Sequence, residues 1–177
     1  GTFILNNPAL TAFRPGLAFY GYSPFSAESK YYHLAKNNLK PALRLYSTII
    51  SVQNIRTGDR VSYSNNFQAE RDMNSAVIPF GYFEGLNRRL SNKAEFLIRS
   101  DKQSSWAKIL GTVCMNMTCI DGGSIDENKL LKSQVQIISE LNEDRNSVEN
   151  LAKLSDSIIY EFLVKINSSI HRKIVLK

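Results

Sequence analysis

The 177-residue sequence has few of the residues that mark specialised classes of protein, with two cysteines, two histidines, one tryptophan and five prolines. Cys114 and Cys119 have an odd separation, so on one strand they would point to opposite faces, which argues against a disulfide between them. His33 and His171 lack partners at the spacing of a metal site and are interpreted as surface residues. No apolar run approaches the ~18 to 20 residues of a membrane span, and no signal-peptide pattern is present. These absences favour a cytoplasmic protein without a disulfide framework, a zinc site or a membrane partner.

The formal net charge of +6 is not concentrated in one basic surface. The clearest clusters are Arg88-Arg89 and residues 171–173, and elsewhere basic residues alternate with acidic ones. No aromatic platform or recognition-helix pattern accompanies them, so we expect no nucleic-acid partner. The alternative is a non-enzymatic binding module, which salt-dependent binding through Arg88, Arg89 and Lys173 would distinguish.

The composition, with 43% hydrophobic and 21% charged residues, is that of a folded domain with one core. The chain begins at Gly1 without a methionine, and we expect it to be a piece of a longer polypeptide. Residues 1–22 are interpreted as one β/α piece whose apolar run at 17–20 has the character of a buried strand. Residues 23–38 have no sustained period and are expected to be a connection. A boundary near residues 39–41 would divide the chain into residues 1–39 and 40–177.

The second part shows short apolar runs of strand length, separated by turn signals such as Thr57-Gly58-Asp59. Strands are predicted within residues 42–52 and at 75–78, 94–98, 106–110, 112–120 and 135–138. Many short strands of this kind predict a mainly β fold, either a barrel or a sandwich.

Helical spacing of apolar residues near the end predicts two short amphipathic helices, at residues 147–153 and 155–166. Asn146 and Glu149 fit a variant of the capping box at the start of the first helix. Ser155 is the expected N-cap of the second helix.

Five strings, in this order along the chain, resemble the alanine racemase family. They are residues 14–21 (RPGLAFYG), 61–72 (VSYSNNFQAERD), 79–92 (PFGYFEGLNRRLSN), 111–118 (GTVCMNMT) and 159–161 (IYE). The resemblance is to the C-terminal half of that family. It implies a mainly β fold, namely a small barrel-like C-terminal domain with short C-terminal helices, preceded by a short β/α remnant of a (β/α)8 barrel.

The resemblance also implies a role for each matched residue. Tyr63 would be the catalytic tyrosine, and Tyr82 would lie at the substrate entrance. The backbone of Met115, with Asn116 beside it, would contact the substrate carboxylate. The residues implied to hold the cofactor, pyridoxal 5'-phosphate, are Arg14 at the pyridine nitrogen and Gly16, Leu17 and Tyr160 at the phosphate.

The sequence departs from the family pattern at two of these positions. Ser64 stands where the family usually has glycine after the catalytic tyrosine, which could alter the turn. Asn116 stands where the family usually has aspartate, so a role that needs a negative charge does not carry over, although an amide still forms hydrogen bonds.

The implied reaction interconverts L- and D-alanine in a homodimer, and it needs two bases, one on each face of the substrate. In the family the cofactor is the electron sink, a Schiff-base lysine serves one face and the tyrosine serves the other. The lysine and the histidine beside the tyrosine lie outside this sequence, so we expect the fragment alone to be inactive. A racemase for serine or a larger amino acid stays an alternative.

Overall fold

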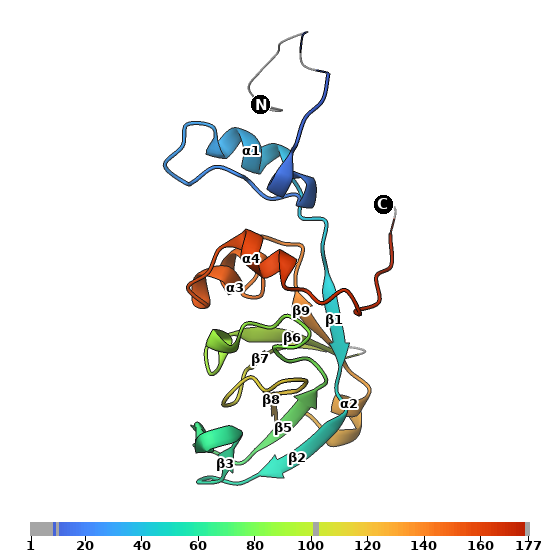
Figure 1. Ribbon diagram of the computed structural model, residues 1–177. Coiled ribbons are helices and arrows are strands. Elements are labelled where there is room, and N and C mark those ends of the chain that lie inside the picture. The colour runs from blue at the N-terminus through green and yellow to red at the C-terminus, as the bar shows by residue number, and fades with distance from the viewer. Residues whose placement is uncertain (1–8, 10, 101–102, 176–177) are drawn as a thin grey trace. The chain divides into compact units, whose positions relative to one another are not determined.

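The structure is a computed structural model that describes residues 9, 11–100 and 103–175. It consists of two compact units, Gly1–Leu43 and Arg44–Lys177, which are described separately here (Figure 1). The expected interior start of a longer polypeptide, at Gly1, lies outside the described residues. That the first unit is a remnant of a barrel stays a prediction.

The first unit contains a 3-10 helix, η1 (Gly16–Tyr20), and a helix, α1 (Tyr32–Asn38). The prediction of a buried strand at residues 17–20 is therefore wrong, and the expected connection at 23–38 ends in a helix. Phe19 and Tyr20 are 77% and 51% exposed, whereas Leu17 is buried. A strand needs a neighbouring strand for its N–H and C=O groups, while this segment forms local bonds such as Gly21 N to Ala18 O (3.1 Å).

The described residues of the second unit form three antiparallel sheets. The four-stranded sheet has the order β1-β9-β6-β7, with β1 (Leu45–Thr48), β6 (Glu95–Ser100), β7 (Gln103–Lys108) and β9 (Gln134–Ile138). The three-stranded sheet has the order β2-β5-β8, with β2 (Ser51–Ile55), β5 (Met73–Ile78) and β8 (Thr118–Gly123). The hairpin of β3 (Arg60–Val61) and β4 (Phe67–Gln68) forms the third. The prediction of a mainly β fold is confirmed.

Two of the predicted strands need correction. The run at 42–52 divides at Ile49, because β1 pairs with β9 in one sheet and β2 pairs with β5 in the other. The strand predicted at 112–120 begins only at Thr118. The residues before Thr118 form a loop, since backbone N–H groups of Gly111, Thr112 and Val113 donate to side chains instead of to a neighbouring strand.

The hydrophobic core of the second unit lies between its sheets and its short helices. Its largest fully buried side chains include Ile78, Phe96, Ile98, Ile120 and Ile137. Burial of each such side chain contributes about 1.5 to 3 kcal/mol, so these strands are the main source of stability. A smaller cluster of Ile55, Ala69, Met73 and Leu110 supports the β3–β4 hairpin, because Val61 and Phe67 pack against it.

Three helices and two 3-10 helices complete the part of the second unit that the structure describes. They are α2 (Glu127–Leu131), α3 (Val148–Leu154), α4 (Ile159–Val164), η2 (Tyr63–Asn65) and η3 (Arg88–Leu90). In Figure 1, α4 and β3 lie toward opposite ends of this unit. None of the helices within the described residues is long and apolar enough to cross a membrane.

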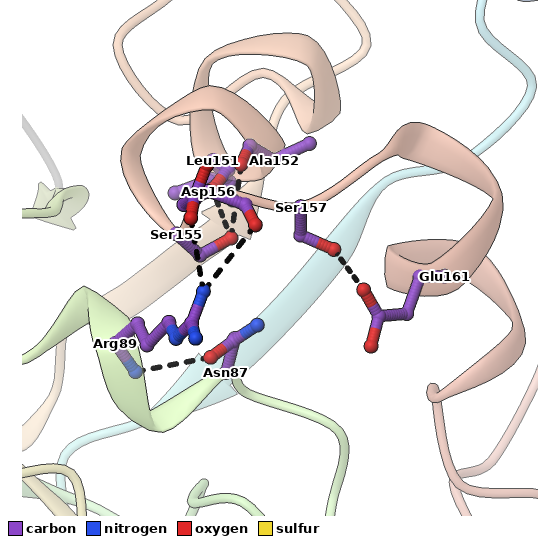
Figure 2. A network of polar contacts seen from close by, with 8 residues as sticks. All are labelled: Asn87, Arg89, Leu151, Ala152, Ser155, Asp156, Ser157 and Glu161. Atoms are coloured by element: carbon purple, nitrogen blue, oxygen red, sulfur yellow. Dashed lines mark hydrogen bonds and ion pairs between the residues drawn. The ribbon is translucent and has the colours of Figure 1, made fainter.

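The two predicted helix caps are both wrong. Ser147, and not Asn146, is the N-cap of α3, where its side chain accepts from Asn150 N, while the buried Asn146 amide donates to Gln136 O. Ser155 follows the end of α3, where its hydroxyl donates to Leu151 O (2.8 Å), as Figure 2 shows. The helix α4 begins four residues later, because a left-handed residue at Asp156 separates the two helices.

Candidate functional site

Tyr63 lies at the tip of the β3–β4 hairpin, and its side chain is 72% exposed. The chain reverses there through three residues of positive φ, which are Ser62 (72°), Ser64 (61°) and Asn65 (52°). Ser64, which stands where the family pattern has glycine, therefore keeps a glycine-like left-handed backbone. A non-glycine residue in that region costs about 1 to 2 kcal/mol, so surrounding contacts must stabilise the turn.

Those contacts come from residues far away in the sequence. The Ser62 hydroxyl donates to Thr112 O (3.0 Å) and accepts from Thr112 N (2.9 Å). Asn66 donates to the Thr112 hydroxyl, and Asn92 donates to Asn66 O (2.8 Å) while accepting from Gly111 N (2.6 Å). A Cβ at Gly111 would lie 2.4 Å from Ser62 Cβ, so this close approach requires glycine. The backbone around Tyr63 is thus fixed against the 111–113 loop.

Tyr82 and Met115 lie on two turns that are bonded to each other. Tyr82 N donates to Cys114 O (3.0 Å), and Phe83 N donates to Met115 O (2.9 Å). The side chains of Tyr82 and Met115 are 45% and 54% exposed, and Asn116 is also exposed. Because the Met115 turn directly follows the loop that holds Tyr63, the structure brings Tyr63, Tyr82, Met115 and Asn116 onto connected loops of one unit.

The implied phosphate ligand Tyr160 is on α4 and is 47% exposed. Its helix, α4, and the strand β3, which precedes Tyr63 in the chain, lie toward opposite ends of the unit (Figure 1). The next residue, Glu161, accepts a hydrogen bond from Ser157 (Figure 2) and another from Lys165. These two hydrogen bonds, that from Lys165 first, lower the pKa of Glu161.

The other implied cofactor residues belong to the first unit. Arg14 is exposed. Gly16 has a φ of 56°, and a Cβ there would meet no atom within 4 Å, so a ligand could approach this backbone closely. The side chain of Leu17 is buried, which leaves its backbone as the group able to serve a ligand. Within the described residues no cluster of three His, Cys, Asp or Glu could hold a metal ion.

Several residues that build this site were given no role from the sequence. Ser91 accepts from Val113 N (2.9 Å), and Asn92 accepts from Gly111 N (2.6 Å), so these two residues of the string at 79–92 fix the 111–113 loop. Glu84 links the Tyr82 and Met115 turns through its carboxylate. The sequence indicated the importance of these residues only through their position, because they lie inside the strings that resemble the alanine racemase family. A shallow hollow beside the Tyr63 loop is lined by Asn66, Arg88, Arg89, Ser91 and Thr112.

Comparison with known proteins gives a consistent picture. A family model described as the alanine racemase C-terminal domain matches residues 42–174. An alanine racemase of Borreliella burgdorferi (strain ZS7) is 38% identical over 169 residues, which cover 94% of this chain and 41% of that protein. The chain therefore spans about two-fifths of the length of this relative.

Two solved structures are similar in fold. The biosynthetic alanine racemase of Pseudomonas aeruginosa has a TM-score of 0.72 at 26% identity. The matched region covers 89% of this chain and 40% of the Pseudomonas chain. The alanine racemase of Bartonella henselae, solved with covalently bound pyridoxal phosphate, has a TM-score of 0.66 at 22% identity. The matched region covers 86% of this chain and 38% of the Bartonella chain.

Proposed function

The chain belongs to the alanine racemase family, and from this we propose that it supplies the catalytic tyrosine of a pyridoxal-phosphate-dependent enzyme that interconverts L- and D-alanine. The complete enzyme would be a homodimer in which Tyr63 of one subunit acts on the substrate held by the barrel of the other. The 177 residues alone would be inactive, because in the family the cofactor lysine belongs to the barrel.

The single observation that carries the proposal is the way in which Tyr63 is held. Racemisation removes a proton from one face of the α-carbon and delivers one to the opposite face, so an acid–base group must be fixed on each face. Tyr63 has an exposed side chain on a backbone that is fixed by the pair of hydrogen bonds between Ser62 and Thr112. Such a phenol can hold or move a proton at its Oη without reorganisation of the loop.

The proposed substrate contacts are on the neighbouring turns. The backbone of Met115, together with Asn116, would bind the substrate carboxylate, and Tyr82 would border the entrance. The three residues are exposed, and their turns are bonded to each other by Tyr82 N to Cys114 O and by Phe83 N to Met115 O. A shared backbone frame of this kind supports a role in orienting a small amino acid.

The residues present fit the cofactor chemically. In the first unit, the exposed guanidinium of Arg14 would suit the pyridine nitrogen, and the backbone at Gly16 and Leu17 would offer donors for a phosphate. In the second unit, the exposed phenol of Tyr160 would by itself offer a phosphate donor. When bound, pyridoxal phosphate supplies the electron sink that makes the α-proton of the substrate acidic.

The test is racemisation of alanine by the full-length polypeptide in the presence of pyridoxal phosphate. Tyr63→Phe should lower kcat/KM for racemisation by about 10²- to 10⁴-fold, the usual contribution of a general acid–base group, and equally from L- and D-alanine, because each direction needs a group on both faces. Tyr46→Phe makes the same chemical change on β1 of the four-stranded sheet, and it should leave the rate of racemisation unchanged. Absence of racemisation by the wild type would exclude the proposal, and serine assayed in parallel would separate the alternative substrate.

A further inference from the structure

The carboxylate of Glu84 joins two of the turns described above. Its Oε2 accepts from Gly81 N (2.8 Å), and its Oε1 accepts from the Asn116 side-chain amide (2.9 Å). The first bond closes the turn that carries Tyr82, and the second fixes the residue after Met115. One side chain therefore holds both turns in register.

The same turn is anchored from a third segment. Asn167, just beyond α4, donates its backbone N–H to Glu84 O (3.1 Å) and its side-chain amide to Phe83 O (3.0 Å). A Cβ at Gly85 would lie 2.5 Å from Lys165 O, so the two segments are in close contact. The backbone of Glu84 thus has little freedom, and its carboxylate is directed at Gly81 and Asn116.

This arrangement decides which residue type suits position 116. An ionised carboxylate only accepts hydrogen bonds, so the atom that faces Glu84 Oε1 at 2.9 Å has to be a donor. The amide of Asn116 is such a donor. An aspartate there would place two carboxylates in contact, and one of them would have to keep a proton or turn away. Asn116 is therefore matched to Glu84 in this chain.

We propose that Glu84 is a positioning residue, which through Asn116 and Gly81 holds the Met115 backbone and Tyr82 in register for the substrate carboxylate. The proposal rests on the proposed function. On this basis the asparagine at position 116 is the donor of a bonded pair whose acceptor is the Glu84 carboxylate.

The experiment exchanges the donor and the acceptor of the hydrogen bond between Asn116 and Glu84. In the full-length polypeptide, Asn116→Asp should raise KM for L-alanine about tenfold with a smaller change in kcat, because two carboxylates then oppose each other. The double variant Glu84→Gln with Asn116→Asp should return KM to within about threefold of wild type, since a glutamine can accept from Gly81 N and donate to Asp at 116. Asn54→Asp, an exposed asparagine that faces the Asn74 amide, is the matched control and should leave KM unchanged.

A second measurement uses the 177-residue chain itself and does not depend on activity. The Gly81 N–H donates to Glu84 Oε2, so its exchange with solvent deuterium should be faster in Asn116→Asp, where the two carboxylates oppose each other, and slow again in the double variant, where the glutamine carbonyl accepts from it. Racemisation by the wild type with the same KM in Asn116→Asp, or an unchanged exchange rate of the Gly81 N–H, would overturn the inference alone. No racemisation by the wild type would instead remove the proposed function, and the exchange rate of the Gly81 N–H would still test the pair of Glu84 and Asn116.

Discussion

Replacement of Gly81 by alanine should separate the turns that carry Tyr82 and Met115. A Cβ at position 81 would lie 2.2 Å from Cys114 O and 2.4 Å from Met115 O, and both of these atoms belong to the backbone. No flexible side chain can move aside, so the backbones themselves have to part by about 1 Å to reach ordinary van der Waals contact. The bonds from Tyr82 N and Phe83 N, now 3.0 and 2.9 Å, would then be out of range.

The magnitude follows from these contacts. Overpacking typically costs about 1 to 3 kcal/mol, and each backbone hydrogen bond that is lost costs about 1 kcal/mol. Alanine restricts the unfolded chain more than glycine does, and this offsets about 0.4 to 1 kcal/mol of the destabilisation. The free energy of unfolding should therefore fall by about 2 to 4 kcal/mol, and at roughly 2 to 4 °C per kcal/mol for a chain of this size Tm should fall by about 5 to 15 °C.

Urea unfolding of the 177-residue chain measures this change through the fluorescence of Trp106, the one tryptophan in the sequence, which lies on β7 in the four-stranded sheet. Gly123→Ala is the matched control. Gly123 also has a positive φ (61°), but a Cβ there would meet no atom within 4 Å. It should cost only about 1 kcal/mol, the strain of a left-handed alanine.

The two variants separate steric conflict from backbone strain. If Gly81→Ala unfolds at the same urea concentration as Gly123→Ala, the close approach of the two turns is not a constraint on the native state. The reasoning about the Tyr82 and Met115 turns would then be refuted.

Two further predictions concern ionisable groups. Hydrogen bonds from the Thr57 backbone N–H and hydroxyl lower the pKa of Asp72 from its ordinary value of 3.8, so its contribution to stability is present above that pH and is lost as the pH falls through the lowered pKa. Asp72→Asn should therefore unfold at lower urea than wild type at pH 6, with the difference disappearing as the pH falls through the lowered pKa of Asp72; a difference that stays constant as the medium is acidified would contradict this. Burial raises the pKa of the Cys119 thiol, so at pH 7.5 iodoacetamide should modify Cys119 more slowly than free cysteine, as followed by mass spectrometry, and equal rates would contradict the burial argument.

The strands of the second unit could be predicted because their alternation matches their burial. In β6, the exposed fraction of Phe96 and Ile98 is at most 1%, and the residues on either side of each are more exposed, as a half-buried strand requires. The run at 17–20 has the same apolar character and forms a 3-10 helix. Composition alone cannot distinguish the two cases, because a strand depends on a partner strand that the sequence of the segment does not contain.

The contacts that hold Tyr63 could not be predicted for a related reason. Ser62 and Thr112 are 50 residues apart, and neither has a pattern that connects it to the other. The apolar residues at 112–117 suggested the start of a strand, whereas the backbone N–H groups at 111–113 donate to the side chains of Asn92, Ser62 and Ser91. Polar side chains that replace a strand partner give no periodic signal in the sequence.

The two departures from the family pattern show what the structure adds to such a comparison. Ser64 keeps the left-handed backbone of a glycine because the turn around it is fixed from outside, by the bonds of Ser62 to Thr112. Asn116 faces the carboxylate of Glu84, so the loss of one negative charge in the sequence is accompanied by a carboxylate in contact with the amide. A substitution that looks like the loss of a functional group has to be judged with the residue that it touches, and here that residue lies 32 positions away in the chain.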